Sequence, residues 1–191
     1  MSKYTDQELL AMFREENSRN MAFNLIIKEY QERIYWHVRK IVIDHDDAND
    51  VAQNTFVKAW KGLDNFREDS KIYTWLYRIA TNESITFLKK KKAHLFSSIE
   101  DVQHGLSANL ESDHYFDGDE IERKLQQALL TLPHKQRIVF NMKYFEEMKY
   151  QEMSEILGTS VGALKASYHH ATQKVKRFLK NDLNLSKQEP S

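Results

Sequence analysis

The sequence predicts an all-α protein made of two small helical domains that are joined by a flexible acidic linker. Only 5 Gly and 2 Pro occur among its 191 residues, and the abundant Leu, Lys, Glu, Gln and Ala favour helices. Toward both ends of the chain, apolar residues recur three or four positions apart, which is the period of an amphipathic helix. The middle of the chain lacks that period.

The N-terminal domain, residues 1–92, is predicted to begin with two helices. Thr5 and Glu8 have the spacing of a capping box, in which each side chain bonds the other residue's backbone N–H group. This predicts a first helix that runs to about Asn17, with Ser18 as the N-cap of the second. The apolar face of the second helix consists of Ala22, Phe23, Ile26, Ile27, Tyr30, Ile34, His37, Val38 and Ile41.

Two more helices are expected in this domain. The acidic segment DHDD, residues 44–47, ends the second helix and supplies an N-cap for the third. Gly62 and the polar residues after it end the third helix. A fourth is predicted from about Lys71 to Lys92, where a run of lysines suits the C-terminal end of a helix. The residues that the third helix is expected to bury are Ala48, Val51, Ala52, Phe56, Ala59 and Trp60.

Residues 93–119 are predicted to form the linker. Residues 93–120 contain 7 acids and no Lys or Arg (−7), against 16 bases and 14 acids in residues 1–92 (+2) and 12 bases and 7 acids in residues 121–191 (+5). Acidic segments with few apolar residues bury too little surface to offset their ordering entropy. The segment is therefore either a solvated tether or a segment that becomes ordered in an electropositive channel of a partner.

The C-terminal domain, residues 120–182, is predicted to hold four helices, followed by a tail at residues 183–191. The first two helices, residues 120–132 and 134–146, each have one apolar face, and Pro133 separates them. In the next segment, YQEMSEILG, Gly158 is placed to end a short helix in the left-handed conformation. Ser160 is the expected N-cap of the last helix.

That last helix has one apolar stripe and one exposed face. The stripe consists of Val161, Leu164, Tyr168, Ala171, Val175 and Phe178. A short helix, a glycine turn and a longer amphipathic helix are typical of a helix-turn-helix, whose second helix enters the DNA major groove. The alternative is an αα-hairpin that packs inside a helical bundle.

The residues exposed at the start of this helix are suited to contact DNA. Small side chains permit close approach, Lys165 can bind phosphate or guanine, and Ser and His side chains can hydrogen-bond. The candidate residues are Ser160, Gly162, Ala163, Lys165, Ala166, Ser167, His169 and His170.

A second candidate surface lies around the start of the fourth helix. Aromatic rings stack on single-stranded bases, and cations bind phosphate. The aromatic and polar candidates here are Phe66, Tyr73, Trp75, Tyr77, Arg67, Lys71, Arg78 and Asn82. The alternative is an ordinary core that buries Trp75, with Tyr73 and Tyr77 on a flanking face. The buried face would consist of Ile72, Trp75, Leu76, Ile79 and Ala80.

The third predicted helix has a polar face of a different kind. It consists of Asp47, Asp50, Gln53, Asn54 and Lys58. A face of acids and amides repels phosphate, so it is a poor DNA surface. It is either solvated or docks another protein.

Three segments in this order resemble a bacterial RNA polymerase sigma factor of the extracytoplasmic-function (ECF) type. They are DANDVAQNTFVKAW (residues 47–60), FREDSKIYTWLYRIATN (residues 66–82) and the segment with LPHKQRIVF and YQEMSEILG (residues 128–171). The resemblance covers about residues 22–92 and 121–179. It implies a transcription initiation factor that binds core RNA polymerase and directs it to promoters, without a cofactor, a metal or catalytic chemistry.

The resemblance also implies a role for each surface. The polar face of the third helix would dock on the coiled coil of the largest polymerase subunit, and the helix that begins after Ser160 would read the −35 promoter element. The linker would enter the polymerase active-site cleft. The residues that would read and melt the −10 element are Asn65, Phe66, Arg67, Lys71, Tyr73, Tyr77, Arg78 and Asn82.

This chain departs from the family at four of these positions. Asn49 and Asn54 stand where acids are common, which implies a less negative docking face. Ser167 and His170 stand where arginines are common. The resemblance therefore implies that the C-terminal domain alone binds DNA weakly and relies on polymerase for avidity.

Other classes of protein fit the sequence less well. Without cysteine there is neither a disulfide nor a thiolate site. Adjacent His169 and His170 point about 100° apart on a helix and cannot easily share a metal. Because no glycine-rich phosphate loop occurs either, an enzyme is not expected. A stand-alone helix-turn-helix regulator is the alternative, but it gives the acidic linker and the polar helix no role.

The N-terminus contains no long apolar run, which predicts neither a signal peptide nor a transmembrane span. We therefore expect a cytoplasmic protein that is not itself a membrane protein. The resemblance adds one more partner, an anti-sigma factor, which can be membrane-anchored.

Overall fold

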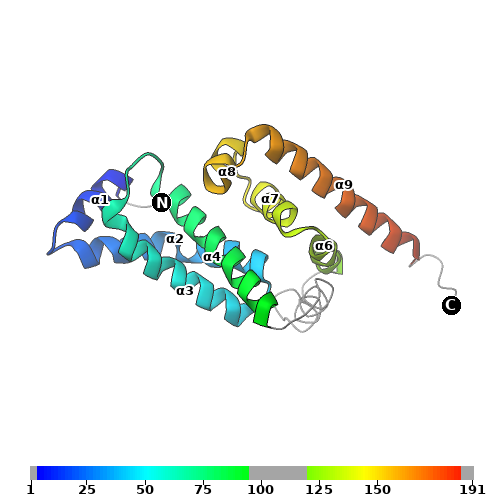
Figure 1. Cartoon of the computed structure of the whole chain (residues 1–191), viewed down its shortest axis with the longest axis horizontal. Helices are drawn as coiled ribbons and strands as arrows, with labels where there is room; N and C mark the ends of the chain where they lie inside the picture. The colour runs from blue at the N-terminus through cyan, green and yellow to red at the C-terminus, as the bar shows by residue number, and fades with distance from the viewer. Residues whose placement is uncertain (1–3, 95–119, 186–191) are drawn as a thin grey trace. The chain divides into compact units, whose positions relative to one another are not determined.

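A computed structural model describes residues 4–94 and 120–185 of the chain (Figure 1). Every regular element within these ranges is a helix, which confirms the predicted all-α class. The chain divides into two compact units, Met1–Lys89 and Lys90–Ser191. Most of the predicted linker lies outside the described residues; its first two positions, 93 and 94, continue a helix of the first unit.

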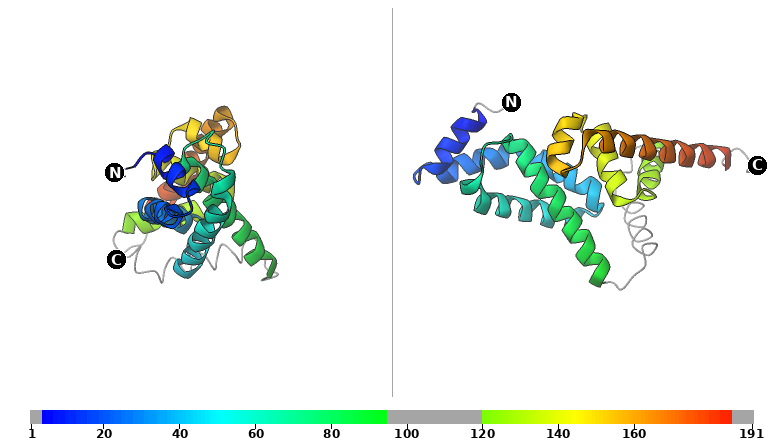
Figure 2. Two further views of the ribbon diagram at one scale, coloured as in Figure 1. Left: turned by 90° about the vertical axis from the view of Figure 1, so that its left-hand side faces the viewer. Right: turned by 45° about the horizontal axis from the view of Figure 1, so that its top comes forward.

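The first unit is a small helical bundle. Its elements are α1 (Asp6–Arg14), α2 (Arg19–Val42), α3 (His45–Gly62), the short 3-10 helix η1 (Leu63–Asn65) and α4 (Ile72–His94). The long helices α2, α3 and α4 lie against one another, as the views of Figures 1 and 2 show. The contacts that join α4 to the other helices include two polar pairs: His37 Nε2 lies 2.9 Å from Thr81 Oγ1, and Lys58 Nζ donates to Glu83 Oε1.

The predicted start of α1 is confirmed. Thr5 Oγ1 accepts a hydrogen bond from the Glu8 N–H at 3.2 Å, and the Thr5 N–H donates to Glu8 Oε2 at 2.7 Å. The helix ends at Arg14 rather than near Asn17. Ser18 is the N-cap residue of α2, as predicted, but its side chain makes no cap bond to that helix. Its hydroxyl instead donates to the Met12 carbonyl oxygen at 2.7 Å and closes the turn between the helices.

A sharp reversal joins α2 to α3. Ile43 adopts a φ of 71°, a conformation that β-branched residues rarely take, and its side chain is only 2% exposed. Burial of this side chain therefore holds the backbone in the turn. Asp44 then caps α3 by accepting from the Asp47 N–H at 3.0 Å, as the acidic segment predicted.

The core of the first unit draws on α1, α2, α3 and α4. Phe56 and Trp60 are exceptions to the predicted burial, because both are only half-buried. The Trp60 ring packs edge-on against Phe13 and Phe23, with centroids 5.2 and 5.0 Å away. The core residues exposed by at most 2% include Leu9, Phe13, Ile26, Ile34, Val38, Ile41, Val51, Ala59, Ile72, Leu76 and Ala80.

The second unit has four described helices. They are α6 (Glu120–Leu130), α7 (His134–Tyr144), α8 (Tyr150–Leu157) and α9 (Val161–Leu185). Pro133 precedes α7, as predicted, and α7 ends two residues earlier than expected. The buried cluster that joins α6, α7 and α9 consists of Ala128, Leu129, Leu132, Phe140, Ala171 and Val175.

The turn between α8 and α9 follows the predicted local chemistry. Gly158 ends α8 in the left-handed conformation, with φ 60° and ψ 32°. Ser160 Oγ then accepts a hydrogen bond from the Ala163 N–H at 3.3 Å, which is the expected N-cap bond of α9. The two helices therefore have the order and relative lengths of a helix-turn-helix.

No helix among residues 4–94 and 120–185 combines the length and the apolar character that crossing a membrane requires.

Candidate nucleic-acid interface and docking groove

The polar face of α3 points outward, as the sequence predicted. Asp50, Gln53, Asn54 and Lys58 are exposed, and Asp47 is half-buried near the N-terminus of the helix. Lys58 is engaged within the unit, because its ammonium lies 2.5 Å from a carboxylate oxygen of Glu83 on α4. Apart from Lys58, this face therefore consists of acids and amides.

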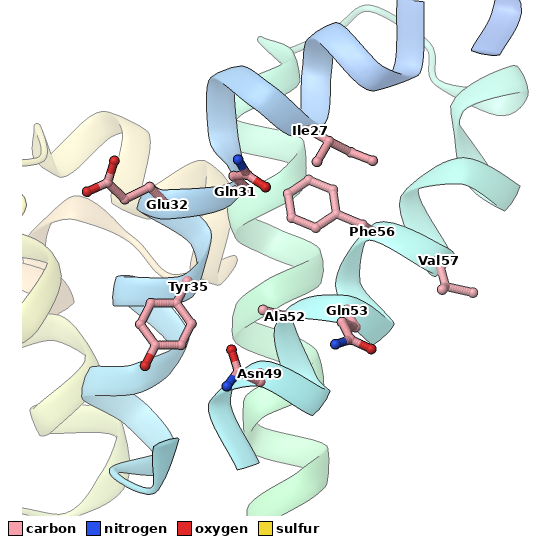
Figure 3. Close-up of a pocket in the computed structure, with 9 residues that line it drawn as sticks. All are labelled: Ile27, Gln31, Glu32, Tyr35, Asn49, Ala52, Gln53, Phe56 and Val57. Atoms are coloured by element: carbon pink, nitrogen blue, oxygen red, sulfur yellow. The ribbon is translucent and has the colours of Figure 1, made fainter. Parts of the chain in front are cut away.

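A groove of about 600 Å³ runs between α2 and α3 beside this face (Figure 3). Gln53 and Asn49 contribute amide groups to its wall. Val57 is 51% exposed, although it is apolar. The residues that line the groove are Ile27, Gln31, Glu32, Tyr35, Asn49, Ala52, Gln53, Phe56 and Val57.

Most of this groove was not predicted from the sequence. Helical periodicity assigned Ile27 and Phe56 to the core, yet both are half-buried and lie on facing walls of the groove in Figure 3. Val57 could have indicated the groove from the sequence, because it is an apolar residue on the otherwise polar side of α3. The groove therefore combines an apolar floor with amide and acidic groups on its rim.

Hydrogen bonds order one end of the groove. Tyr35 Oη lies 2.7 Å from His45 Nδ1, and Asn49 Nδ2 lies 3.1 Å from His45 Nε2. A neutral imidazole satisfies both contacts when Nδ1 donates to the tyrosine oxygen and Nε2 accepts from the amide. His45 thereby links the end of α2 to the start of α3.

The aromatic and basic candidates around α4 divide by exposure. Asn65, Arg67, Lys71 and Asn82 are exposed, whereas Tyr73 and Arg78 are half-buried. Phe66 and Tyr77 are buried, with exposed fractions of 7% and 2%. These two rings therefore support the surface from below rather than forming its outer layer.

Two ring contacts hold Tyr77 in place, one with buried His37 and one with half-buried Tyr73. Its ring centroid lies 4.7 Å from that of His37 and 4.4 Å from that of Tyr73. Trp75, which the alternative of an ordinary core would bury, is only half-buried, and its ring centroid lies 5.1 Å from that of Phe66. The faces of α4 are therefore rotated slightly from those that its periodicity predicted.

Tyr73 is the half-exposed aromatic group of this surface, and α2 supplies its neighbours. The Arg33 guanidinium lies 4.6 Å from the Tyr73 ring centroid, a cation–π arrangement, and the Tyr30 ring lies 6.4 Å away. Burial, followed by the negative charges of Asp6 and Glu29, raises the pKa of Tyr30 to about 12. Tyr30 is therefore neutral at physiological pH, and exposed Arg33 adds a cation that sequence reasoning missed.

The candidate residues on α9 lie together on one exposed face. Ser167 is half-buried, and the others are exposed: Ser160, Gly162, Ala163, Lys165, Ala166, His169 and His170. No Cβ-sized obstacle lies within 4 Å of Gly162, so the backbone here is openly accessible. The surface at the start of α9 therefore consists of small and polar side chains, and Lys165 is the cation among them.

Tyr150 at the start of α8 is the residue of this surface that the sequence analysis missed. Lys165 Nζ lies 5.9 Å and Lys143 Nζ 5.3 Å from its ring centroid. Partial burial, with a smaller contribution from Tyr168, raises the pKa of Tyr150. Tyr150 therefore stays neutral between two lysines and joins α7, α8 and α9 at one place.

Arg137 on α7 is a buried cation of the second unit, with an exposed fraction of 2%. Its Nη2 lies 3.1 Å from His134 Nδ1. Burial lowers the pKa of Arg137 to about 10, so the guanidinium is still charged at neutral pH. Arg137 is therefore part of the interior of the second unit.

Comparison with protein families matches both units. Residues 26–94 match the family model described as Sigma-70 region 2, and residues 122–175 match the one described as Sigma-70, region 4. Together these ranges span more than half of the 191 residues. The two units, in this order, therefore define an RNA polymerase sigma factor, a class of promoter-directing initiation factors rather than enzymes.

Individual relatives identify the type of sigma factor more closely. The RNA polymerase sigma-H factor of Pseudomonas aeruginosa is 30% identical over 189 residues, covering 94% of this chain and 96% of the relative. The ECF RNA polymerase sigma factor SigW of Bacillus subtilis is 32% identical over 168 residues, with 84% and 90% coverage. The chain belongs to the ECF sigma factors of the sigma-70 family.

Two solved structures share the fold. The sigma factor RpoE from Bartonella quintana, in complex with the anti-sigma factor NepR, matches with a TM-score of 0.64 and 21% identity over 83% of this chain and 96% of that chain. CnrH, in complex with the cytosolic domain of CnrY, matches with a TM-score of 0.67 and 24% identity over 93% and 98% of the two chains.

Proposed function

We propose that this sigma factor contacts core polymerase through α3, the −10 promoter element through the surface around α4, and the −35 element through the start of α9. The domains that carry these contacts are residues 1–92 and 120–182. The observation that carries this proposal is the separation of the surfaces: acids and amides line α3, whereas rings and cations surround the start of α4.

The docking contact comprises the exposed face of α3 together with the neighbouring groove. Asp50, Gln53 and Asn54 are exposed, and apolar Val57 lies next to them at 51% exposure. An interface core is apolar and its rim is polar, and this combination suits a helical coiled coil of polymerase. Asp47 and Lys58 flank the contact; Lys58 also holds α3 to α4 through Glu83.

The −10 contact uses a half-exposed ring surrounded by polar and basic groups. Tyr73 is the ring available for base stacking, and the Arg33 guanidinium lies over it. Asn65, Arg67 and Lys71 are exposed between α3 and α4. Stacking and phosphate binding are the two interactions that hold single-stranded nucleic acid. Arg78 and Asn82 extend the surface along α4, and buried Phe66 and Tyr77 support it.

The −35 contact uses the start of α9. Lys165 is the cation there, and Ser167, His169 and His170 supply hydrogen-bonding groups. Because this surface has one lysine and no arginine, it binds weakly alone, and polymerase supplies avidity by holding both promoter contacts at once.

Three further features belong to the same proposal. The acidic segment, residues 93–119, enters the active-site cleft of polymerase, where its charge resembles that of a nucleic acid. An anti-sigma factor holds the free protein, as the structurally similar RpoE and CnrH complexes suggest. The cytoplasm is its compartment, because polymerase and promoter DNA are there.

Run-off transcription tests the proposal. Core polymerase with this protein is expected to give discrete transcripts from a defined set of promoters, and core polymerase alone is the control. Absence of any promoter-dependent product beyond that of core alone contradicts the proposal. Tight, specific gel shifts by the free protein without polymerase would instead favour a stand-alone regulator.

A further inference from the structure

Three side chains near the N-terminus contact the segment that leads into α4. Asp6 Oδ2 accepts a hydrogen bond from the Ile72 N–H at 2.9 Å, although 66 positions separate the two residues. Arg14 Nη2 lies 2.5 Å from Glu68 Oε1. Arg19 donates two hydrogen bonds to the Asp64 carboxylate, at 2.9 and 2.5 Å. The segment is thus held at its start, its middle and its end.

The Asp6 contact supplies what the local sequence lacks. The first N–H groups of a helix have no partner within the helix, and a side-chain oxygen of the preceding residue often accepts from one of them. The residue before Ile72 is Lys71, whose ammonium is only a donor. Asp6 therefore provides the accepting oxygen from another helix, and its negative charge suits the positive end of the α4 dipole.

The other two contacts hold the loop before α4. Glu68 adopts a φ of 60°, in the left-handed region that residues other than glycine seldom occupy, and Arg14 binds its carboxylate. The Arg19 guanidinium lies over the Phe13 ring at 4.1 Å and near the Trp60 ring at 5.1 Å, so its position is well defined. The hydrogen bond from Arg19 lowers the pKa of Asp64, which keeps that carboxylate charged.

These contacts originate outside the range that the Sigma-70 region 2 model matches. The match to Sigma-70 region 2 begins at residue 26, whereas Asp6, Arg14 and Arg19 precede it. The loop and the start of α4 that they hold carry Arg67, Lys71 and Tyr73 of the proposed −10 surface. The N-terminal helix α1 is therefore in a position to control the geometry of that surface.

We infer that Asp6 is a positioning residue for −10 recognition: from α1 it caps α4, and it thereby sets the position of Lys71 and Tyr73. Arg14 and Arg19 hold the intervening loop in the same way. This inference rests on the proposed role of the α4 surface.

Two variants of Asp6 and one control variant distinguish a positioning role of Asp6 from a general effect on the stability of the fold. Asp6→Ala removes the accepting oxygen, whereas Asp6→Asn keeps an oxygen that can accept from the Ile72 N–H. Glu8→Ala removes the side-chain half of the α1 capping box, keeps the bond from the Glu8 N–H to Thr5 Oγ1, and leaves Asp6 in place. Each variant is made in the full chain and assembled with core polymerase.

Binding of a fork-junction DNA with a single-stranded −10 element is the first measurement. Loss of a helix cap corresponds to roughly a fivefold change in an equilibrium constant. We expect Asp6→Ala to bind the fork about fivefold more weakly, with Asp6→Asn and Glu8→Ala within about twofold of the parent protein. The affinity of Asp6→Ala for core polymerase should not change, because neither Asp6 nor Ile72 belongs to α3 or lines the groove beside it.

Amide hydrogen exchange of the free protein is the second measurement. Asp6→Ala should exchange faster at Ile72 and the next residues of α4, and Asp6→Asn should restore protection. Unchanged exchange in Asp6→Ala overturns the inference. So does an equal loss of fork binding in Glu8→Ala, or a loss of core affinity that matches the loss of fork binding.

The parent holoenzyme separates this inference from the proposed function. If it binds fork DNA with a scrambled −10 element as well as the promoter sequence, the proposed function fails and the inference fails with it. If it discriminates and Asp6→Ala discriminates equally well with equal affinity, the inference alone is wrong.

Discussion

Gln53 connects the two parts of the proposed docking site, because it belongs to the exposed face of α3 and also lines the groove. Its neutral amide can donate and accept hydrogen bonds. A residue in this position reports on the docking contact without contributing to the core, since its side chain is exposed. The same reasoning applies to Lys165 on α9, which is exposed at the start of the proposed reading helix.

Gln53→Lys is predicted to weaken binding to core polymerase by roughly tenfold, because a charged group replaces a hydrogen-bonding amide at an interface. Pull-down or fluorescence titration with core polymerase measures the change, and circular dichroism checks the fold. Gln7→Lys is the matched control, because Gln7 is exposed on α1 and receives the same charge. Unchanged affinity of Gln53→Lys rejects the docking role.

Lys165→Ala is predicted to reduce transcription from promoters that depend on the −35 element. If Lys165 binds a phosphate, the log–log slope of DNA affinity against salt should flatten by about 1. Lys180→Ala is the control, because Lys180 is exposed later on the same helix. An equal effect of both substitutions on −35 use would contradict a specific role for Lys165.

At the scale of single elements, α4 has two functions on its two sides. Leu76 and Ala80 are fully buried and hold the helix in the first unit, while Asn82 is exposed on the proposed −10 surface. Tyr77 belongs to the buried side, where His37 and Tyr73 pack against it. Helix α4 thus contributes both to the packing of the first unit and to its proposed DNA contact.

The turn before α9 provides a prediction about stability. Gly158→Ala should lower the free energy of unfolding by about 1 kcal/mol, because an alanine at φ 60° is strained even though no atom obstructs its Cβ. Gly162→Ala, inside α9 and equally unobstructed, should raise it by about 0.5–1 kcal/mol. Urea unfolding of both variants measures the difference. A Gly158→Ala variant as stable as the parent would contradict the assigned turn.

At the scale of the whole molecule, the chain consists of two compact units with separate cores. The buried cluster of the second unit draws only on α6, α7 and α9 and their connections. A domain of this size has a small core and a correspondingly modest stability. Each unit should nevertheless fold without the other.

Fragments of residues 1–94 and 120–185 test that independence. Both should be helical by circular dichroism, and the shorter one should unfold with about 3–5 kcal/mol. The thermal unfolding curve of the full chain should equal the sum of the fragment curves. A midpoint several degrees higher for either unit in the full chain would show that the units stabilise each other.

Features that depend on neighbouring residues in the chain could be predicted from the sequence. The Thr5–Glu8 capping box, the Asp44 cap and the left-handed Gly158 all follow from the chemistry of one helix end. The side of α9 that is exposed was also predictable, because an apolar stripe at spacings of three and four residues leaves one face for solvent.

Features that depend on residues distant in the sequence could not be predicted in the same way. Periodicity placed Trp75 in the core and Tyr77 beside it, yet Trp75 is half-buried and Tyr77 is 2% exposed. The reason is that His37 on α2 packs against Tyr77, while Phe66 from the loop packs on Trp75. The period of apolar residues in a helix defines the direction of its buried face. It does not define which residues at the edges of that face are covered by a neighbouring helix.

The amino-acid sequence alone was therefore sufficient for the all-α class, most helix ends and the candidate surfaces, because helix propensity, capping and periodicity act over a few residues. The groove between α2 and α3, the Arg33–Tyr73 pair and the capping of α4 by Asp6 required the tertiary structure. Each joins residues from different helices. Their proximity depends on how the helices pack, which no local pattern encodes.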